Sequence, residues 1–255
     1  MHIRYVVPGA MRKAPSGPAE LQRRHAILAG WAAPGTTVSI TDAPSGPLSI
    51  ETAYDGYLCV PFLVDALAEA ERDDVDAIIV GCADDPAVDA LRELAVRTLV
   101  VGPAMTSVHM AAMLGRAIGI ISVPEVASLY RLLGSYGMTS HIADIAVLDS
   151  TVLGLREDRD ATAAMVRAAA RDLTRAGADV IVYGCLSLAF LGIDSEVEDA
   201  AGVPVVNPAR TALAVATAMV RAGLMPSKKA YPSPAATGAN GAAHPAPELE
   251  HVRQT

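Results

Sequence analysis

The sequence predicts an α/β protein with two pseudo-symmetric lobes, each a parallel sheet flanked by helices, and with the active site in the cleft between them. Three observations lead to this class. Short aliphatic runs alternate with longer amphipathic stretches, as in βαβ units. Hydrophobic residues make up 52% of the 255 residues and aromatic residues only 4%, which suits an aliphatic core around buried parallel strands. Two segments of the chain also repeat each other.

The aliphatic runs predict strands and the amphipathic stretches predict helices, in alternation along the chain. The predicted strands are 3–7, 37–41, 77–80, 98–101, 117–122, 143–147, 180–183 and 203–206. The predicted helices are 19–32, 60–72, 87–94, 108–114, 126–136, 158–175 and 211–222. Residues 227–255 lose this periodicity and become rich in Pro, Ala and Gly, so we expect a disordered tail without a catalytic role.

The internal repeat consists of two matched blocks in the same order. DAIIVGC at 76–82 and DVIVYGC at 179–185 lie 103 residues apart. Residues 100–117 and 205–222 lie 105 residues apart and share eight of eighteen positions. Chance similarity between alanine-rich helices is the alternative. We interpret the repeat as a duplication that gives two lobes related by a pseudo-twofold axis.

Charge and cysteine content exclude several classes of protein. The net charge of −8 argues against nucleic-acid binding, which needs a basic surface. No apolar run approaches the roughly 18 residues of a membrane helix. The apolar part of the N-terminal segment MHIRYVVPGA is too short for a signal peptide, and three cysteines, an odd number, suit a reducing compartment. We therefore expect a cytoplasmic protein without a membrane or nucleic-acid partner.

The sequence also lacks the signatures of cofactors and metals. No CxxC spacing, GxGxxG after the first strand or GxxxxGK[ST] occurs. The lysines are Lys13, Lys228 and Lys229, and none suits a buried Schiff base. We therefore expect no cofactor and no metal, and side chains must supply the chemistry.

Two cysteines end predicted strands, at the edge of a parallel sheet where ligands bind. Asp85 and Pro86 after Cys82 predict a helix cap and a first helical residue, which would place this thiol near a helix N-terminus and favour its thiolate. The segment LSLAFLG after Cys185 predicts a longer apolar loop. We expect Gly81 and Gly184 to allow close approach of substrate to exposed backbone amides.

Two thiols facing each other across a lobe interface suggest acid and base chemistry on opposite faces of one carbon. One thiolate would remove a proton while the other thiol donates one, which inverts the centre. A buried free cysteine is more often a small hydrophobic residue, and we accept that interpretation for Cys59. The duplicated context favours catalysis for Cys82 and Cys185.

Three segments carry a family resemblance. VGCADDPAVDALREL, YGCLSLAFLG and SGPLSIETAYDGYL resemble the aspartate/glutamate/hydantoin racemase superfamily, and most nearly its hydantoin racemase branch, which includes allantoin racemase. The resemblance spans residues 1–225. It implies a cofactor-independent 1,1-proton transfer by Cys82 and Cys185 on a hydantoin-type small molecule. It also implies a homo-oligomer and a discontinuous first lobe, 1–105 with 207–226, around a second lobe, 106–206.

The expected substrate contacts follow from the strand ends and from the resemblance. They are Gly81, Ala83, Asp84, Ser122, Gly184, Leu186 and Ser187. Ser122 is alternatively a helix cap, and so is Glu51, which contacts substrate by family analogy. Thr106 and Thr211 are candidates to line the cleft, whereas His109 is given no chemistry.

The residues after each cysteine bear on the substrate. Ala83-Asp84 and Leu186-Ser187 stand where amino-acid racemases of the superfamily carry Asn-Thr and Thr-His, so free aspartate or glutamate is less favoured. Four apolar residues after the second cysteine favour a ring or an apolar substituent, unless they belong to the core: Leu186, Leu188, Ala189 and Phe190. Maleate isomerisation and arylmalonate decarboxylation are alternatives, although such decarboxylases resemble this scaffold with only the second cysteine. A two-lobed small-molecule binder is the non-enzymatic alternative.

Overall fold

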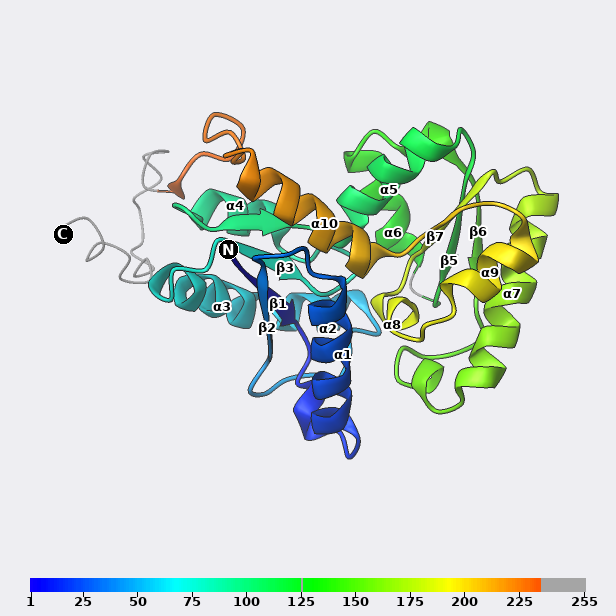
Figure 1. The fold of residues 1–255 in the computed structure, drawn as a ribbon, viewed down its shortest axis with the longest axis horizontal. Coiled ribbons are helices and arrows are strands. Elements are labelled where there is room, and N and C mark those ends of the chain that lie inside the picture. The colour runs from blue at the N-terminus through cyan, green and yellow to red at the C-terminus, as the bar shows by residue number, and fades with distance from the viewer. Residues whose placement is uncertain (125, 235–255) are drawn as a thin grey trace.

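The computed structural model describes residues 1–124 and 126–234. It contains two separate four-stranded sheets, one in each lobe (Figure 1), and every pair of neighbouring strands is parallel. The fold class predicted from the sequence, two α/β lobes with parallel sheets, is confirmed.

The two sheets have the same topology. The first sheet has the order β2-β1-β3-β4 and the second the order β6-β5-β7-β8. The strands are β1 (His2–Val7), β2 (Thr37–Asp42), β3 (Ala77–Val80), β4 (Leu99–Val101), β5 (Ile118–Ser122), β6 (Ile142–Val147), β7 (Val180–Tyr183) and β8 (Val205–Val206). All eight predicted strands are present; β3 and β7 have the predicted ends, and the other six are shifted at one end by one or two residues. The two copies of the repeated block place β3 and β7 at equivalent positions in their sheets.

The helices cover both faces of the sheets. They are α1 (Gly17–Trp31), α2 (Ala53–Leu58), α3 (Val60–Arg72), α4 (Val88–Leu94), α5 (Pro103–Leu114), α6 (Val126–Ser135), α7 (Arg159–Arg175), α8 (Leu186–Ala189), α9 (Asp194–Ala201) and α10 (Pro208–Arg221), with 3-10 turns at Met11–Lys13, Thr139–His141 and Gly154–Arg156. α5 and α10 start earlier than predicted because a proline fits the first helical position. The short α2 and α8 were not predicted.

α5 and α10 each follow a strand of one sheet and pack on the other lobe. Ala212 and Leu213 of α10 lie in the core of the first lobe with Ile79. Val108 of α5 lies in the core of the second lobe with Val180. The two helices also pack against each other. On this packing we keep the predicted lobe boundaries, 1–105 with 207–226 and 106–206, as a proposal.

The predicted disordered tail covers 227–255, of which 235–255 lie outside the described residues. The segment 227–234 lies against α4, where the Lys228 ammonium donates to the Arg92 carbonyl at 2.7 Å and Arg92 donates to the Tyr231 hydroxyl at 3.1 Å. Across 1–124 and 126–234, none of the helices is both long enough and apolar enough to span a membrane.

Candidate active site

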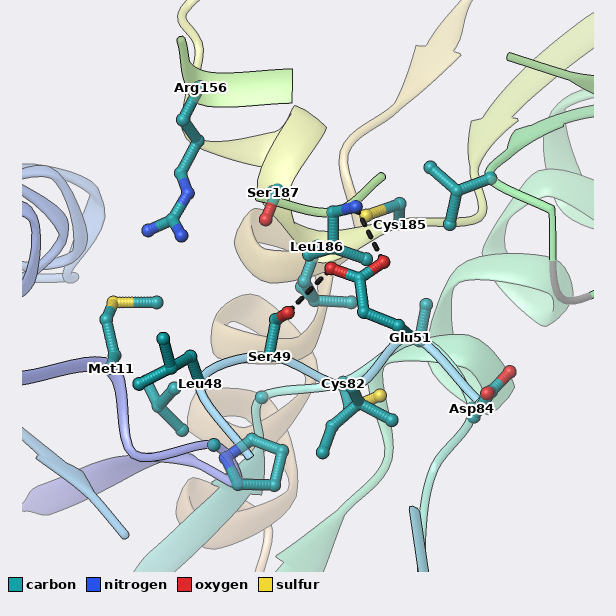
Figure 2. Close-up of a pocket in the computed structure, with 18 of the residues that line it drawn as sticks. Met11, Leu48, Ser49, Glu51, Cys82, Asp84, Arg156, Cys185, Leu186 and Ser187 are labelled. Carbon is teal, nitrogen blue, oxygen red and sulfur yellow. Dashed lines mark hydrogen bonds between the residues drawn. The ribbon is translucent and has the colours of Figure 1, made fainter. Parts of the chain in front are cut away.

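One pocket collects the two predicted catalytic cysteines and the seven predicted substrate contacts. Its lining comes from the carboxyl-end loops of both sheets. The predicted residues in the lining are Gly81, Cys82, Ala83, Asp84, Ser122, Gly184, Cys185, Leu186 and Ser187. The two thiols therefore enter one pocket from two lobes, as Figure 2 shows.

The glycines before the two cysteines have a different role from the one predicted. The Gly81 N–H donates to the Val6 carbonyl at 2.7 Å, and the Gly184 N–H donates to the Ile121 carbonyl at the same distance. These amides are therefore used within the sheets and are not exposed to a substrate. A Cβ on Gly81 would lie 2.6 Å from the Tyr5 ring, so the neighbouring strand requires glycine here.

Cys82 is half-buried, and burial raises the pKa of its thiol well above the usual value, with a further increase from the Asp84 carboxylate. The predicted helix start beside this thiol is wrong. α4 begins only at Val88, after Ala87 in a left-handed conformation with φ of 58°. The thiol is thus several residues away from the helix dipole that was expected to favour its thiolate.

Asp85 caps a different helix from the one predicted. Its carboxylate accepts hydrogen bonds from the backbone N–H groups of Ala104 and Met105, at 3.0 and 2.9 Å, in the first turn of α5. The Tyr136 hydroxyl donates to the same carboxylate at 2.8 Å. Burial nevertheless raises the pKa of Asp85 to about 6. Asp85 therefore joins the loop after Cys82 to α5 and to the turn that follows α6, and it stays out of the pocket.

Cys185 is buried and occupies the N-cap position of α8 in an extended conformation. Part of the predicted apolar loop is therefore this short helix. Burial raises the pKa of the Cys185 thiol, while the backbone N–H groups of Ser187 and Leu188 and the positive charge of Arg24 act in the opposite direction. A backbone N–H, that of Asp84, also lowers the pKa of Cys82, so the difference is that Cys185 has a second such N–H and the positive charge of Arg24.

Two arginines in the pocket were missed by the sequence analysis. Arg24 lies on α1 and is only 2% exposed, with its guanidinium 2.7 Å from Glu20 and 3.3 Å from the Ser187 hydroxyl. Arg156 ends the 3-10 turn after β6, and its guanidinium extends into the pocket (Figure 2). Burial lowers the pKa of Arg156. Neither residue lies near a repeated motif, so only the fold brings them to the thiols.

Glu51 links the two lobes at the pocket. Its carboxylate accepts from the Ser49 hydroxyl at 2.6 Å and from the backbone N–H groups of Val152 and Leu153 at 2.9 and 3.3 Å (Figure 2). The alternative role as a helix cap is wrong, because Thr52 caps α2. Glu51 thus fixes a first-lobe loop to a second-lobe loop across the pocket.

Several other candidates lie elsewhere. Thr106, predicted to line the cleft, donates its hydroxyl to the Gly102 carbonyl at 3.0 Å, and Thr211 lines a separate hollow beside Trp31. Cys59 is buried outside the pocket, as expected, and burial raises its pKa to about 11. His109 is exposed. The described residues contain no cluster of three or more His, Cys, Asp or Glu side chains suited to a metal ion.

The fold and pocket define a class of protein: a duplicated α/β scaffold that brings one thiol from each lobe to a shared site. The model of the Asp/Glu/Hydantoin racemase family matches residues 14–216, and the chain belongs to this family. It is accordingly an enzyme of the isomerase class, a racemase.

Similar proteins and solved structures agree with this membership. A hydantoin racemase from Paenarthrobacter aurescens is 33% identical over 200 residues, which cover 77% of this chain and 84% of the relative. The allantoin racemase structure from Klebsiella pneumoniae has a TM-score of 0.80 at 26% identity, and the match covers 89% of this chain and 91% of that chain. The allantoin racemase from Pseudomonas fluorescens has a TM-score of 0.79 at 27% identity, with 92% and 97% covered.

Proposed function

We propose that this protein is a cofactor-independent racemase of a 5-substituted hydantoin and that it uses Cys82 and Cys185 as a two-base pair. One observation carries the proposal: the two thiols lie just beyond the ends of equivalent strands, β3 and β7, of two equivalent sheets and line the same pocket. The similarity to hydantoin and allantoin racemases supports the class of substrate. Cytoplasmic location and assembly into a homo-oligomer remain predictions from the sequence.

The proposed reaction exchanges one proton for another at the stereocentre. One thiolate takes the proton from C5 and becomes a thiol, while the electron pair of the broken C–H bond moves into the adjacent carbonyl to give an enolate. The opposite thiol then donates its proton to the other face and becomes a thiolate. The product is the mirror-image hydantoin, and the charge has moved from one cysteine to the other.

The raised pKa values of both thiols suit this task. A thiolate with a raised pKa is a stronger base, which a weak carbon acid requires. The cost is that a smaller fraction of the enzyme carries a thiolate at neutral pH. Because the pocket also presents apolar side chains, including Met11, Leu48 and Val152, it can exclude water from the enolate.

The test follows an enantiopure 5-substituted hydantoin in deuterium oxide, with optical rotation and deuterium at C5 measured together. We expect loss of rotation together with deuterium incorporation, above a control without enzyme. Cys82→Ala and Cys185→Ala should each abolish racemisation. Cys59→Ala is the matched control, because Cys59 lies outside the pocket, and it should retain activity.

Other results would overturn parts of this proposal. Full activity in both pocket-cysteine variants would reject the two-thiol mechanism. Turnover of maleate without exchange on any hydantoin would favour the isomerase alternative. Binding of hydantoins without any exchange would favour a small-molecule binder.

A further inference from the structure

Arg156 is a charged group of the pocket that the proposed proton transfer does not use. Its Nε atom is buried and has no hydrogen-bond partner within the described residues. Arg156 also takes part in no ion pair with another described residue. A buried donor without a partner is unfavourable, so a group that accepts a hydrogen bond from it gains affinity.

The surroundings of Arg156 carry excess positive charge. Glu20 is the acidic neighbour, but its carboxylate already accepts from Arg23 at 2.8 and 2.9 Å and from Arg24 at 2.7 Å. Glu20, Arg23 and Arg24 all act electrostatically on Arg156. The Glu20 carboxylate is therefore already paired with two guanidinium groups, and Arg156 is a third positive charge within electrostatic reach of it.

Two carboxylates line the rest of the pocket: Glu51, which already accepts hydrogen bonds from Ser49, Val152 and Leu153, and Asp84. In Figure 2 the Arg156 guanidinium and the Asp84 carboxylate lie on opposite sides of the two cysteines. A substrate whose stereocentre lies between the thiols therefore extends toward cationic groups on one side and toward a carboxylate on the other. This polarity selects both the chemical nature and the orientation of the substituent.

We infer that Arg156, supported by Arg24, binds a carboxylate on the substituent of the hydantoin, so that the preferred substrates are hydantoins of acidic amino acids. The inference rests on the proposed function, because it assumes that the ring lies between the thiols. A guanidinium binds a carboxylate through paired, charge-assisted hydrogen bonds, which a neutral amide cannot reproduce. This differs from the apolar substituent that Leu186 favours in the sequence.

The test compares the hydantoins of glutamate, glutamine and leucine, of which the first two match in shape and differ in charge. For the unmodified enzyme we expect kcat/KM to be about 10-fold or more higher for the glutamate compound than for the glutamine compound. Arg156→Met should remove this preference and leave kcat/KM for the leucine compound within about threefold of its original value. Arg156→Lys should retain part of the preference, because it keeps the charge.

The matched control is Arg171→Met, which removes an exposed arginine of α7 that does not line the pocket. It should leave all three values unchanged. Equal turnover of the glutamate and glutamine compounds by the unmodified enzyme would overturn the inference. So would an equal loss for all three compounds in Arg156→Met, because Arg156 would then act on the ring or its enolate.

Calorimetric titration separates this inference from the proposed function. If no hydantoin is racemised, the proposed function fails, yet binding of the same three compounds still decides the role of Arg156. Tighter binding of the glutamate compound, lost in Arg156→Met, would support it. Equal binding of the glutamate and glutamine compounds would reject it.

Discussion

The loops that follow Cys82 and Cys185 begin from equivalent positions and then diverge. Both cysteines follow a glycine whose N–H is bonded to the neighbouring strand at 2.7 Å. After Cys82 the chain places the Asp84 carboxylate near the thiol, whereas after Cys185 it forms α8 and presents two backbone N–H groups. The duplicated strands thus set where the thiols are, and the loops set how readily each one ionises.

We therefore expect that, in the resting enzyme, a thiolate forms more readily at Cys185 than at Cys82. Arg24 and the amides of α8 stabilise a thiolate there, while Asp84 opposes one at Cys82. The two thiols therefore have equivalent positions in the fold but different electrostatic surroundings. Four experiments test how far the two lobes differ at matched positions.

The largest effect is expected from replacing one thiol at a time with a hydroxyl. Cys82→Ser and Cys185→Ser should each lower racemisation by about 10³-fold, since a hydroxyl is a far weaker acid and base. In deuterium oxide each variant should still exchange the proton of one enantiomer, and the two variants should act on opposite enantiomers. Proton NMR of each pure enantiomer measures this. Exchange of the same enantiomer by both variants would contradict thiols on opposite faces.

The equivalent glycines should differ in their cost of substitution. A Cβ on Gly81 would meet the Val6 carbonyl oxygen at 2.9 Å, which is backbone, while one on Gly184 would meet the Ile120 side chain at 2.9 Å. We expect Gly81→Ala to lower the free energy of unfolding by about 2–3 kcal/mol and Gly184→Ala by about 1–2 kcal/mol, because side chains yield more easily. Urea denaturation measures both.

The control for this pair is Gly30→Ala. Gly30 is an exposed residue of α1 whose added Cβ would meet nothing within 4 Å. Alanine is a better helix former, so this variant should be as stable as the original or slightly more stable. Equal losses in Gly81→Ala and Gly184→Ala would show that the two strand ends are equivalent in packing as well as in topology.

The helices that follow β4 and β8 are capped in different ways at matched positions. Asn207 caps α10 with its own side chain, which accepts from the Arg210 N–H at 3.1 Å. Gly102 occupies the matching position before α5 and leaves room for the Asp85 carboxylate, which a Cβ would strike. The first lobe thus uses a buried carboxylate where the second uses an amide.

The buried carboxylate of Asp85 predicts a pH dependence of stability that the Asp85→Asn variant lacks. Because burial raises the pKa of Asp85 to about 6, the folded protein binds a proton between pH 4 and 6 that the unfolded chain has released. Stability should therefore fall as the pH rises through this range, by about 1–3 kcal/mol relative to Asp85→Asn. Unfolding at a series of pH values tests this. Asp65→Asn, an exposed change on α3, is the control and should follow the original protein.

The smallest effect is expected at Asp84. Its carboxylate raises the pKa of Cys82, so Asp84→Asn should lower that pKa and move thiolate formation to lower pH. Alkylation of Cys82 by iodoacetamide, followed by mass spectrometry across pH, should become severalfold faster near neutral pH, whereas alkylation of Cys185 should change less. Unchanged alkylation of Cys82 would mean that burial alone sets its ionisation. Asp65→Asn serves again as the control.

The sequence predicts the strands and the equivalent positions of the two thiols, because both depend on local pattern. The aliphatic runs predict all eight strands, and the repeat alone identifies Cys82 and Cys185 as a pair. The seven residues predicted to contact substrate line the same pocket as these cysteines. These are features that a strand end and its adjacent residues determine.

The remaining features depend on contacts between distant segments. Arg24 lies in an amphipathic helix, where an arginine normally faces solvent, and only the packing of α1 against Ser187 reveals that it is buried. Asp85 has the sequence position of a cap for the next helix, but its partners are in α5 and in the turn after α6. Four residues of α8 are too few for a helical period to be visible.

The exchange of α5 and α10 between the lobes has a consequence for how the chain folds during synthesis. The core of the first lobe includes Ala209, Ala212, Leu213 and Ala216 of α10, so the apolar face of its sheet stays uncovered until residues 208–221 leave the ribosome. The second lobe receives α5 before its own strands are made. The lobe that is synthesised first is therefore completed last.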